Sequence, residues 1–335
     1  MSRGTPILYI PGIMGSQLYL PEDGRKLWFS PAAVLTDTGR LDISSPLSVK
    51  NNGIDLQTKT PLQREHGVLK QDILLIEWLC LSYPDSPVYF FSYDFRRSCR
   101  EAADALKVQI DQLLAGGAEQ VNIVCHSMGG LVTSSYVTRY GADALRNVVM
   151  LGVPFEGSYE VAHIYLTGDI RDVPNTIAET VGITREMLAG YPGLAELMPS
   201  VRHLEESPLT REGELLNREQ QEALFAALIP ETYKDARLFR EEIETGLSLL
   251  REKENCFFGI GDGKTTLRSL DLRKGIGSPT PVETKNGDGL VTTFSALMGG
   301  MLSVQNTRVR AFPVRHANLL RHPDALKWIA ECLRE

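Results

Sequence analysis

Six short apolar runs, separated by segments with helical periodicity, constrain the fold of this 335-residue chain more than any other feature. The runs are rich in β-branched or aromatic residues and lack strong polar alternation, which is typical of strands buried on both faces of a largely parallel sheet. The segments between them carry apolar stripes typical of helices, with Gly116-Gly117 as a stop signal and Pro323 as a start signal. Alternating strands and helices predict a doubly wound α/β fold. The predicted strands are residues 7–10, 88–93, 121–125, 148–151, 256–260 and 309–314, and the predicted helices are residues 69–80, 102–114 and 322–333.

Two long segments interrupt this alternation. Residues 17–64 are polar and rich in turns, with Trp28-Phe29 as an isolated aromatic pair, and residues 155–251 hold helical patterns and no clear strand. Long excursions from a compact sheet are usually lids or binding loops, and parallel sheets bind ligands at the carboxyl ends of their strands. We therefore expect a core made of residues 1–154 and 252–335, with a loop insertion at about 17–64 and a helical cap or lid at 155–251.

Composition excludes several classes of protein. Charged residues make up 23% of the chain, and 35 basic against 42 acidic residues give a net charge of −7, which disfavours nucleic-acid binding and strong docking on anionic membranes. Shallow, transient contact of Trp28-Phe29 with a membrane surface stays open, as does packing of this pair against the body. No apolar stretch approaches the ~20 residues that a transmembrane helix needs. The N-terminal residues lack a signal pattern, so we expect a cytoplasmic protein, with a removed leader as the alternative.

The five cysteines are widely spaced and form no C-x-x-C pair. This pattern predicts mostly free, buried thiols in a reducing compartment and no zinc site, although a Cys80–Cys99 disulfide stays open. We expect neither a metal nor a cofactor.

The sharpest motif is residues 121–132, in which an apolar strand runs into Ser127 and a helical pattern follows at once. This is the context of a nucleophile elbow, where a tight turn holds the serine hydroxyl clear of the backbone and small neighbours let the helix pack on the strand. Cys125 stands where the usual G-x-S-x-G pattern has its first glycine. The alternative is an ordinary surface serine in a turn between strand and helix.

A serine nucleophile needs a base, and the base needs an orienting acid. The chain order of this fold is serine, acid, histidine, which favours His316, directly after the last predicted strand, over His322 at the start of the last helix. Asp262 and Asp288 both lie in Gly-Asp-Gly turns, and topology alone favours Asp262 because it follows a strand directly. His126 is expected to point away from the site, and His66, His163 and His203 lie in the insertions and are expected to be solvated or structural.

A glycine-rich loop follows the first predicted strand at residues 11–16. Glycines let a backbone approach an ester oxygen closely. The N–H groups of Ile13 and Met128 are therefore the candidate oxyanion donors. A nucleotide-binding interpretation of residues 259–265 fails, because a phosphate loop needs four residues between its first glycine and Gly-Lys, and Gly259 leaves three.

Six segments, in order along the chain, resemble motifs of the lecithin:cholesterol acyltransferase family of α/β-hydrolases, which includes lysosomal phospholipase A2 and phospholipid:diacylglycerol acyltransferases. They are residues 10–18 (Ile-Pro-Gly-Ile-Met-Gly-Ser-Gln-Leu), 93–96 (Tyr-Asp-Phe-Arg), 126–130 (His-Ser-Met-Gly-Gly), 151–158 (Leu-Gly-Val-Pro-Phe-Glu-Gly-Ser), 287–291 (Gly-Asp-Gly-Leu-Val) and 316–320 (His-Ala-Asn-Leu-Leu). Cys125, Phe95 and Leu290 depart from the family pattern, which indicates a distant member, of bacterial type.

The resemblance implies that Asp288, rather than Asp262, is the acid, and hence a Ser127–Asp288–His316 triad. It gives Asp94 and Arg96 structural roles. It also implies acyl transfer from a lipid ester to water or an alcohol through an acyl-serine intermediate. The alternatives are a soluble carboxylesterase or thioesterase that acts on small esters, and a non-catalytic protein that binds a lipid or a partner. Four apolar residues of the predicted lid have two interpretations. They line an acyl groove if the substrate is a lipid ester, or they are ordinary core residues of the lid: Leu188, Leu194, Leu197 and Met198.

Overall fold

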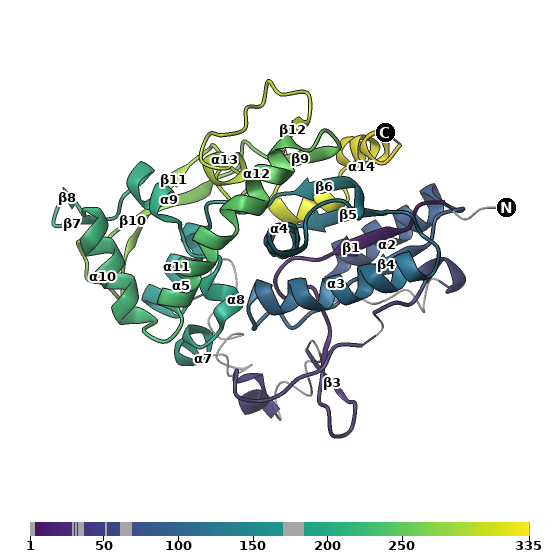
Figure 1. Cartoon of the computed structure of the whole chain (residues 1–335). Helices are drawn as coiled ribbons and strands as arrows, with labels where there is room; N and C mark the ends of the chain where they lie inside the picture. Colours follow the sequence, from purple (N-terminus) through teal and green to yellow (C-terminus); the bar gives the residue numbers. More distant parts are fainter. Residues whose placement is uncertain are drawn as a thin grey trace.

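The computed structural model describes residues 4–28, 30, 32, 37–50, 52–60, 69–169 and 184–334. Its centre is a six-stranded sheet in which every neighbouring pair is parallel, in the order β12-β9-β6-β5-β1-β4 (Figure 1). All six predicted strands are confirmed, and together they make up this sheet. They are β1 (Ile7–Ile10), β4 (Val88–Phe90), β5 (Val121–His126), β6 (Leu145–Leu151), β9 (Cys256–Gly261) and β12 (Val309–Phe312).

Successive side chains of the central strands enter two different hydrophobic clusters, one on each face of the sheet. In β1, Leu8 and Ile10 join one cluster, whereas Ile7 and Tyr9 join the other. This alternation follows from the two-residue period of a strand. Because both faces are covered, the strands are unbroken apolar runs in the sequence.

Helices cover both faces, as an α/β fold requires. The predicted helices are confirmed as α2 (Lys70–Ser82), α3 (Cys99–Ala115) and α14 (Pro323–Cys332). Side chains of α2 and α14 belong to the cluster on one face, and those of α3 and α4 (Met128–Tyr140) belong to the cluster on the other face. Ser98 caps the N-terminus of α3 by accepting from the Arg100 N–H at 3.1 Å.

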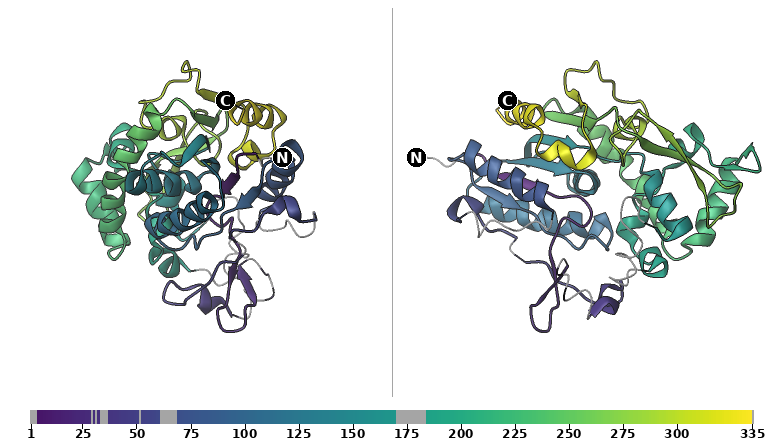
Figure 2. Two further views of the ribbon diagram at one scale, coloured as in Figure 1. Left: turned by 45° about the vertical axis from the view of Figure 1, so that its right-hand side comes forward. Right: turned by 180° about the vertical axis from the view of Figure 1, so that it is seen from behind.

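Most of the cap lies at the end of the molecule opposite the N-terminus (Figures 1 and 2). Two short strands within it, β7 and β8, were not expected. They pair with each other, and β7 also pairs with β10 from beyond residue 252, which gives a four-stranded sheet in the order β11-β10-β7-β8. Residues 266–284, which were assigned to the core, thus form one sheet with strands of the cap. The division of the chain at residues 154 and 252 stays a prediction. The elements are α5 (Tyr159–Thr167), α7 (Arg185–Ala189), α8 (Pro192–Ala195), α9 (Val201–Glu206), β7 (Thr210–Arg211), β8 (Glu214–Leu215), α10 (Arg218–Leu228), α11 (Tyr233–Glu242), α12 (Glu244–Glu252), β10 (Thr266–Asp271) and β11 (Thr280–Thr284).

The described part of the loop insertion contains β2 (Leu18–Tyr19), β3 (Lys26–Trp28) and the short 3-10 helices η1 (Thr38–Leu41) and η2 (Leu56–Thr58). Trp28 is buried, and its ring meets the Phe95 ring edge-on at 5.5 Å between centroids. Its indole N–H donates to the Met14 carbonyl at 3.0 Å. Trp28 thus packs against the body rather than offering a face to lipid, and Phe29 lies outside the described residues.

All five cysteines are buried and none forms a disulfide, which confirms the expectation from their spacing and rules out a Cys80–Cys99 bond. Within the described ranges, no helix has the length and apolar character that crossing a membrane requires.

Candidate active site

Ser127 stands between the last residue of β5 and the first residue of α4 with a backbone φ of 54° and ψ of −124°. A positive φ is uncommon for a residue with a side chain and costs roughly 1–3 kcal/mol, so the surrounding structure must hold it. The Ser127 N–H donates to the Leu151 carbonyl of β6 at 2.9 Å, which fixes the turn to the neighbouring strand. The local geometry is that of the nucleophile elbow predicted from the sequence.

Gly129 and Gly130, two and three residues after the serine, let α4 pack closely on the sheet. A Cβ at Gly129 would lie 2.5 Å from the Ile10 carbonyl oxygen, and one at Gly130 would lie 2.2 Å from a methyl carbon of Val153. Cys125, two residues before the serine, is fully buried in the sheet, and its sulfur lies 3.7 Å from the Val149 carbonyl oxygen. A small thiol therefore fits where the usual pattern has glycine.

His316 and Asp288 form a direct pair at the carboxyl end of the sheet. His316 begins the 3-10 helix η4 (His316–Leu320), and its Nδ1 lies 2.7 Å from Asp288 Oδ2. The His316 backbone N–H donates to the Asp288 carbonyl at 2.9 Å. The other carboxylate oxygen, Oδ1, accepts from the Leu290 N–H at 3.0 Å and the Val291 N–H at 2.8 Å. Asp288 is 1% exposed, so these three contacts hold a carboxylate that water barely reaches.

Of the two candidate acids, Asp288 is the one beside His316. Asp262 accepts from the Thr293 hydroxyl at 2.9 Å instead. Topology pointed to the end of β9, and Asp288 does lie there in space: a Cβ at Gly261, the last residue of β9, would be 2.5 Å from Asp288 Cβ. The end of β9 therefore lies beside both candidates, and a later turn brings Asp288 there.

The His126 ring lies against the His316 ring, with 4.6 Å between centroids, rather than pointing away from the site. Burial, and next the charge of His316, keep the pKa of His126 well below its ordinary value, so His126 is neutral. A Cβ at Gly12 would lie 2.9 Å from Ser127 Cβ and 3.3 Å from His126 Nδ1. The glycine-rich loop at residues 11–16, the elbow and His316 are therefore packed together around His126.

The two candidate oxyanion donors, the N–H groups of Ile13 and Met128, belong to the residues that directly follow Gly12 and Ser127 in the chain. Met128 is the first residue of α4, where a helix leaves its N–H groups without an intrahelical acceptor. The Ile13 N–H has no acceptor among the described residues. Next to it, Met14 has a positive φ of 64°, and the Gly15 N–H donates to the Gly12 carbonyl at 3.1 Å. The loop is thus a tight turn, and it is Gly12 of this turn that packs against Ser127.

Asp94 and Arg96 are structural, as expected. The Arg96 guanidinium is fully buried and donates to Asp94 from Nε at 2.9 Å and from Nη2 at 2.6 Å. It also donates to the carbonyls of Leu41, Asp42 and Ser45, which ties the loop insertion to the core.

Sequence reasoning missed two side chains that hold the acid turn. Ser158 donates to the Leu290 carbonyl at 2.5 Å, and the buried His203 bridges the Glu156 carbonyl at 3.0 Å and the Thr292 hydroxyl at 3.2 Å. Burial lowers the pKa of His203 to about 4. The sequence marks residues 151–158 as a motif, but nothing in it shows which turn this segment contacts.

His163 is buried on α5, and His322 precedes α14, whereas His66 lies outside the described residues. Over the ranges that the structure covers, no cluster of His, Cys, Asp or Glu could hold a metal ion.

The family model described as "Lecithin:cholesterol acyltransferase" matches residues 81–238. The match spans slightly less than half of the chain, which is similar to this family over that stretch. The match includes Ser127 and most of the cap but ends before Asp288 and His316, so those two residues rest on the motifs and on the geometry.

A curated relative of the chain is "Lecithin-cholesterol acyltransferase-like 4" of Arabidopsis thaliana, which is 24% identical over 187 residues. The alignment covers 46% of this chain and 35% of the relative, so the chain spans about a third of that protein's length.

Among solved structures, a chain of the Tle4-Tli4 complex has a TM-score of 0.59 and 16% identity, with 98% of each chain covered, and this likeness shows the fold. The mature form of the Bacillus licheniformis lipase BlEst2 has a TM-score of 0.40 and 11% identity, with 96% of this chain and 88% of the lipase covered. The expected α/β-hydrolase fold with a largely parallel sheet is confirmed.

Proposed function

We propose that the chain is a serine acyl hydrolase or O-acyltransferase that takes an acyl group from a lipid ester and passes it to water or an alcohol. One observation carries the proposal: a strained Ser127 at the end of β5 shares one edge of the sheet with a His316–Asp288 pair at 2.7 Å. The family supports an acyl ester as donor, and the name of the Arabidopsis relative specifies acyl transfer.

In the proposed reaction, His316 Nε2 accepts the proton of the Ser127 hydroxyl as the oxygen attacks the ester carbonyl. Asp288 accepts from Nδ1–H, which fixes the imidazole tautomer and stabilises the imidazolium that forms. The Ile13 and Met128 N–H groups stabilise the oxyanion, each by roughly 3 kcal/mol. His316 then protonates the leaving alcohol, and an acyl group remains on Ser127.

Water or a second alcohol accepts this acyl group in the second half of the reaction. The triad serves both acceptors equally, so access of water to the acyl-serine decides the outcome. Ser127 is 8% exposed and His316 is 6% exposed, so the cap restricts this access. A Cβ at Gly193 of α8 would lie 2.8 Å from the terminal methyl of Met128, so α8 packs against the side chain of the residue that follows Ser127. This arrangement favours acyl transfer in the presence of an apolar alcohol.

The residues proposed for an acyl groove are all buried in the main hydrophobic cluster. Leu188 is 2% exposed, and Leu194, Leu197 and Met198 are each 5% exposed. They therefore serve as cap core in this structure, and α8 must move if they are to contact an acyl chain.

The test is an acyl-release assay with wild-type protein and Ser127→Ala on phospholipid vesicles and on a p-nitrophenyl ester series of increasing chain length. Each assay runs with and without a long-chain alcohol. Ser127-dependent release from vesicles, with ester formed on the alcohol, supports the proposal. Release confined to short soluble esters favours a carboxylesterase or thioesterase. Absence of Ser127-dependent turnover on any substrate contradicts the proposal and favours the binding protein.

A further inference from the structure

Arg240 on α11 is a buried cation whose donors are only partly used. The residue is 8% exposed, and its Nη1 donates to the Phe155 carbonyl at 2.6 Å and to the Pro154 carbonyl at 3.3 Å. Its Nε and Nη2 are buried and have no acceptor among the described residues. A guanidinium has five N–H donors in a planar fork, and buried polar groups are rarely left unpaired.

No carboxylate of the described residues forms an ion pair with Arg240. The two nearest acids in electrostatic effect, Glu156 and Glu196, are engaged elsewhere. Glu156 accepts from Ser200 and lies 3.3 Å from Arg202 Nη1. Glu196 accepts from Ser98 and from the Cys99 N–H. Burial lowers the pKa of Arg240, against the raising effect of Glu156, yet an arginine stays protonated at neutral pH.

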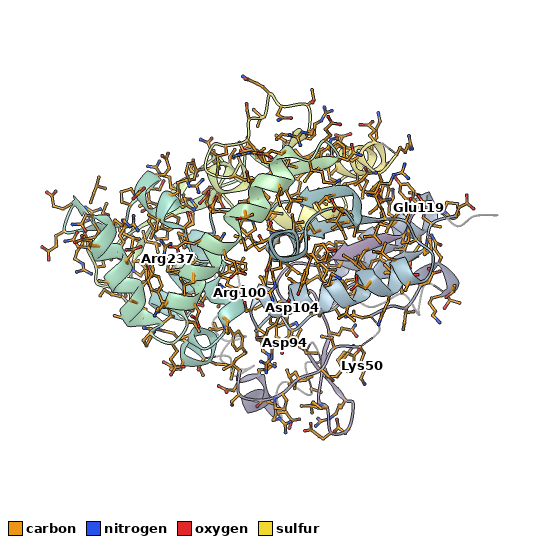
Figure 3. The ribbon with its side chains drawn as sticks, viewed as in Figure 1. Lys50, Asp94, Arg100, Asp104, Glu119 and Arg237 are labelled. Carbon is orange, nitrogen blue, oxygen red and sulfur yellow. The ribbon has the colours of Figure 1, made fainter. Side chains whose placement is uncertain are left out.

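Arg240 lines a cavity of about 290 Å³ within the cap, bounded by residues of α9, α10, α11 and α12 and by Phe155 and Glu156. Three further arginines line it, and Figure 3 shows Arg237 of this set in the cap, far from Glu119 at the other end of the molecule. Three of the four lining glutamates, Glu205, Glu241 and Glu244, are exposed, whereas Arg240 is the buried cation of the set. The remaining glutamate is Glu156, and burial raises its pKa, which disfavours its negative charge.

The wall of this cavity is continuous with the elbow. Arg240 holds the carbonyls of Pro154 and Phe155, which follow Leu151 and Gly152 at the end of β6. Leu151 accepts from Ser127, and a Cβ at Gly152 would lie 3.1 Å from the His316 ring. The same short segment therefore touches the candidate active site and the arginine cavity.

We propose that this cavity is a phosphate-binding site anchored by Arg240. Both atoms are covered in this structure, so the proposal includes a shift of the Arg240 side chain toward the cavity. Once uncovered, the Nε and Nη2 edge offers two parallel donors to two oxygens of one phosphate, a geometry that suits a guanidinium group. The phosphate has two sources, the headgroup of a phospholipid substrate and free inorganic phosphate. Binding of a phospholipid headgroup rests on the proposed function, whereas binding of inorganic phosphate does not.

Calorimetric titration of the full chain with inorganic phosphate, at fixed ionic strength against chloride, tests the site without any turnover. Wild-type protein is expected to bind saturably, and Arg240→Gln to bind at least about tenfold more weakly, the usual effect of losing a charge-assisted hydrogen-bonding group. Arg310→Gln, an exposed arginine on β12, is the matched control and keeps wild-type affinity. If Arg240→Gln does not fold, Arg237→Gln takes its place, because its side chain is only 18% exposed on the cavity wall, and a several-fold loss is expected.

Kinetics then separate the two sources. The two substrates are a phospholipid and a neutral diacylglycerol. If the site binds the headgroup, Arg240→Gln should raise the ratio of the phospholipid KM to the diacylglycerol KM about tenfold. Inorganic phosphate should then compete with the phospholipid and not with the diacylglycerol. A free-phosphate site leaves that ratio unchanged while calorimetric binding is still lost in Arg240→Gln. Absence of saturable phosphate binding to the wild-type protein, together with an unchanged KM ratio, overturns the site. Phosphate binding without any Ser127-dependent turnover contradicts the proposed function and leaves the site standing.

Discussion

The turn that carries Asp288 and the first turn of α2, which carries Asp72, bury two carboxylates to the same extent and pair them differently. Each side chain belongs to a residue that is 1% exposed. Asp288 is contacted by the N–H groups of Leu290 and Val291 and by His316. Asp72 accepts from the Tyr9 hydroxyl through Oδ1, and its Oδ2 has no donor among the described residues.

The two carboxylates therefore differ in their donors and not in their burial. Burial raises the pKa of Asp72 to about 7, against the lowering effect of its hydrogen bond with Tyr9. A search for strongly perturbed carboxyl groups would therefore have selected Asp72, since such groups cluster at functional sites. The donors that surround Asp288 stabilise a negative charge at the place where His316 needs one. Within the part of the chain that the structure describes, the Asp72 carboxylate has a single donor, and that donor is not a histidine.

The largest expected effect is the loss of activity in Asp288→Asn. Asparagine keeps the shape but presents an N–H to His316 Nδ1, which selects the wrong imidazole tautomer and lowers kcat by about 10⁴-fold. The measurement is kcat on a p-nitrophenyl ester. Asp262→Asn is the matched control, because Asp262 follows β9 and contacts Thr293 instead. Equal losses in both variants, or near-normal turnover in Asp288→Asn, would contradict the assignment.

Asp72→Asn tests the other half of the comparison through stability. The folded-state pKa of Asp72, about 7, lies above the ordinary value of 3.8, so the folded protein favours the protonated acid. The stability that this proton provides is present below about pH 4 and is lost as the pH rises through about 7. An asparagine at this position would mimic the protonated form, so the variant should match wild type near pH 4 and exceed it at pH 8, by at most about 4 kcal/mol.

Urea unfolding of both proteins across this pH range measures the difference. Asp111→Asn, in which an exposed carboxylate is removed, provides the comparison and should show little pH dependence in its free energy of unfolding relative to wild type. A difference between Asp72→Asn and wild type that stays constant from pH 4 to pH 8 would rule out a proton on Asp72 in the folded state.

The sequence predicts the features that are encoded locally and misses those that depend on contacts between distant segments. The six strands, three flanking helices and the elbow were predictable because each is encoded locally, by apolar runs and by the residues on either side of Ser127. The strands β7 and β8 were not, because each is two residues long and is stabilised by pairing within a sheet completed far along the chain.

The choice between Asp262 and Asp288 shows the same limit at the site. Both lie in Gly-Asp-Gly turns, and only the folded chain reveals that the turn at residue 288 returns to the end of β9. Family motifs pointed to the residue that lies beside His316, whereas strand order pointed to the other. The cavity at Arg240 had no sequence signal, because its arginines come from three different helices.

The smallest expected effect comes from Ser158→Ala, which weakens the support of the acid turn without touching Asp288. Ser158 donates to the Leu290 carbonyl at 2.5 Å, and the Leu290 N–H in turn donates to Asp288. Ser158 also caps α5 by accepting from the Glu160 N–H at 3.2 Å. Loss of the first bond should lower kcat by up to about tenfold, since one hydrogen bond contributes about 1 kcal/mol, and loss of the cap should cost a similar amount of stability.

Asn217→Ala separates these two effects, because Asn217 caps α10 through its hydrogen bonds with Gln220, far along the chain from the acid turn. Both variants should lose about 1 kcal/mol of stability in urea unfolding, but only Ser158→Ala should lower kcat. If the two variants lower kcat equally, the general stability of the insertion at residues 155–251 governs activity, and the Ser158–Leu290 hydrogen bond does not. Asp288 would then owe its position to its own turn and to His316, and the pairing that distinguishes it from Asp72 would extend no further than its three direct donors.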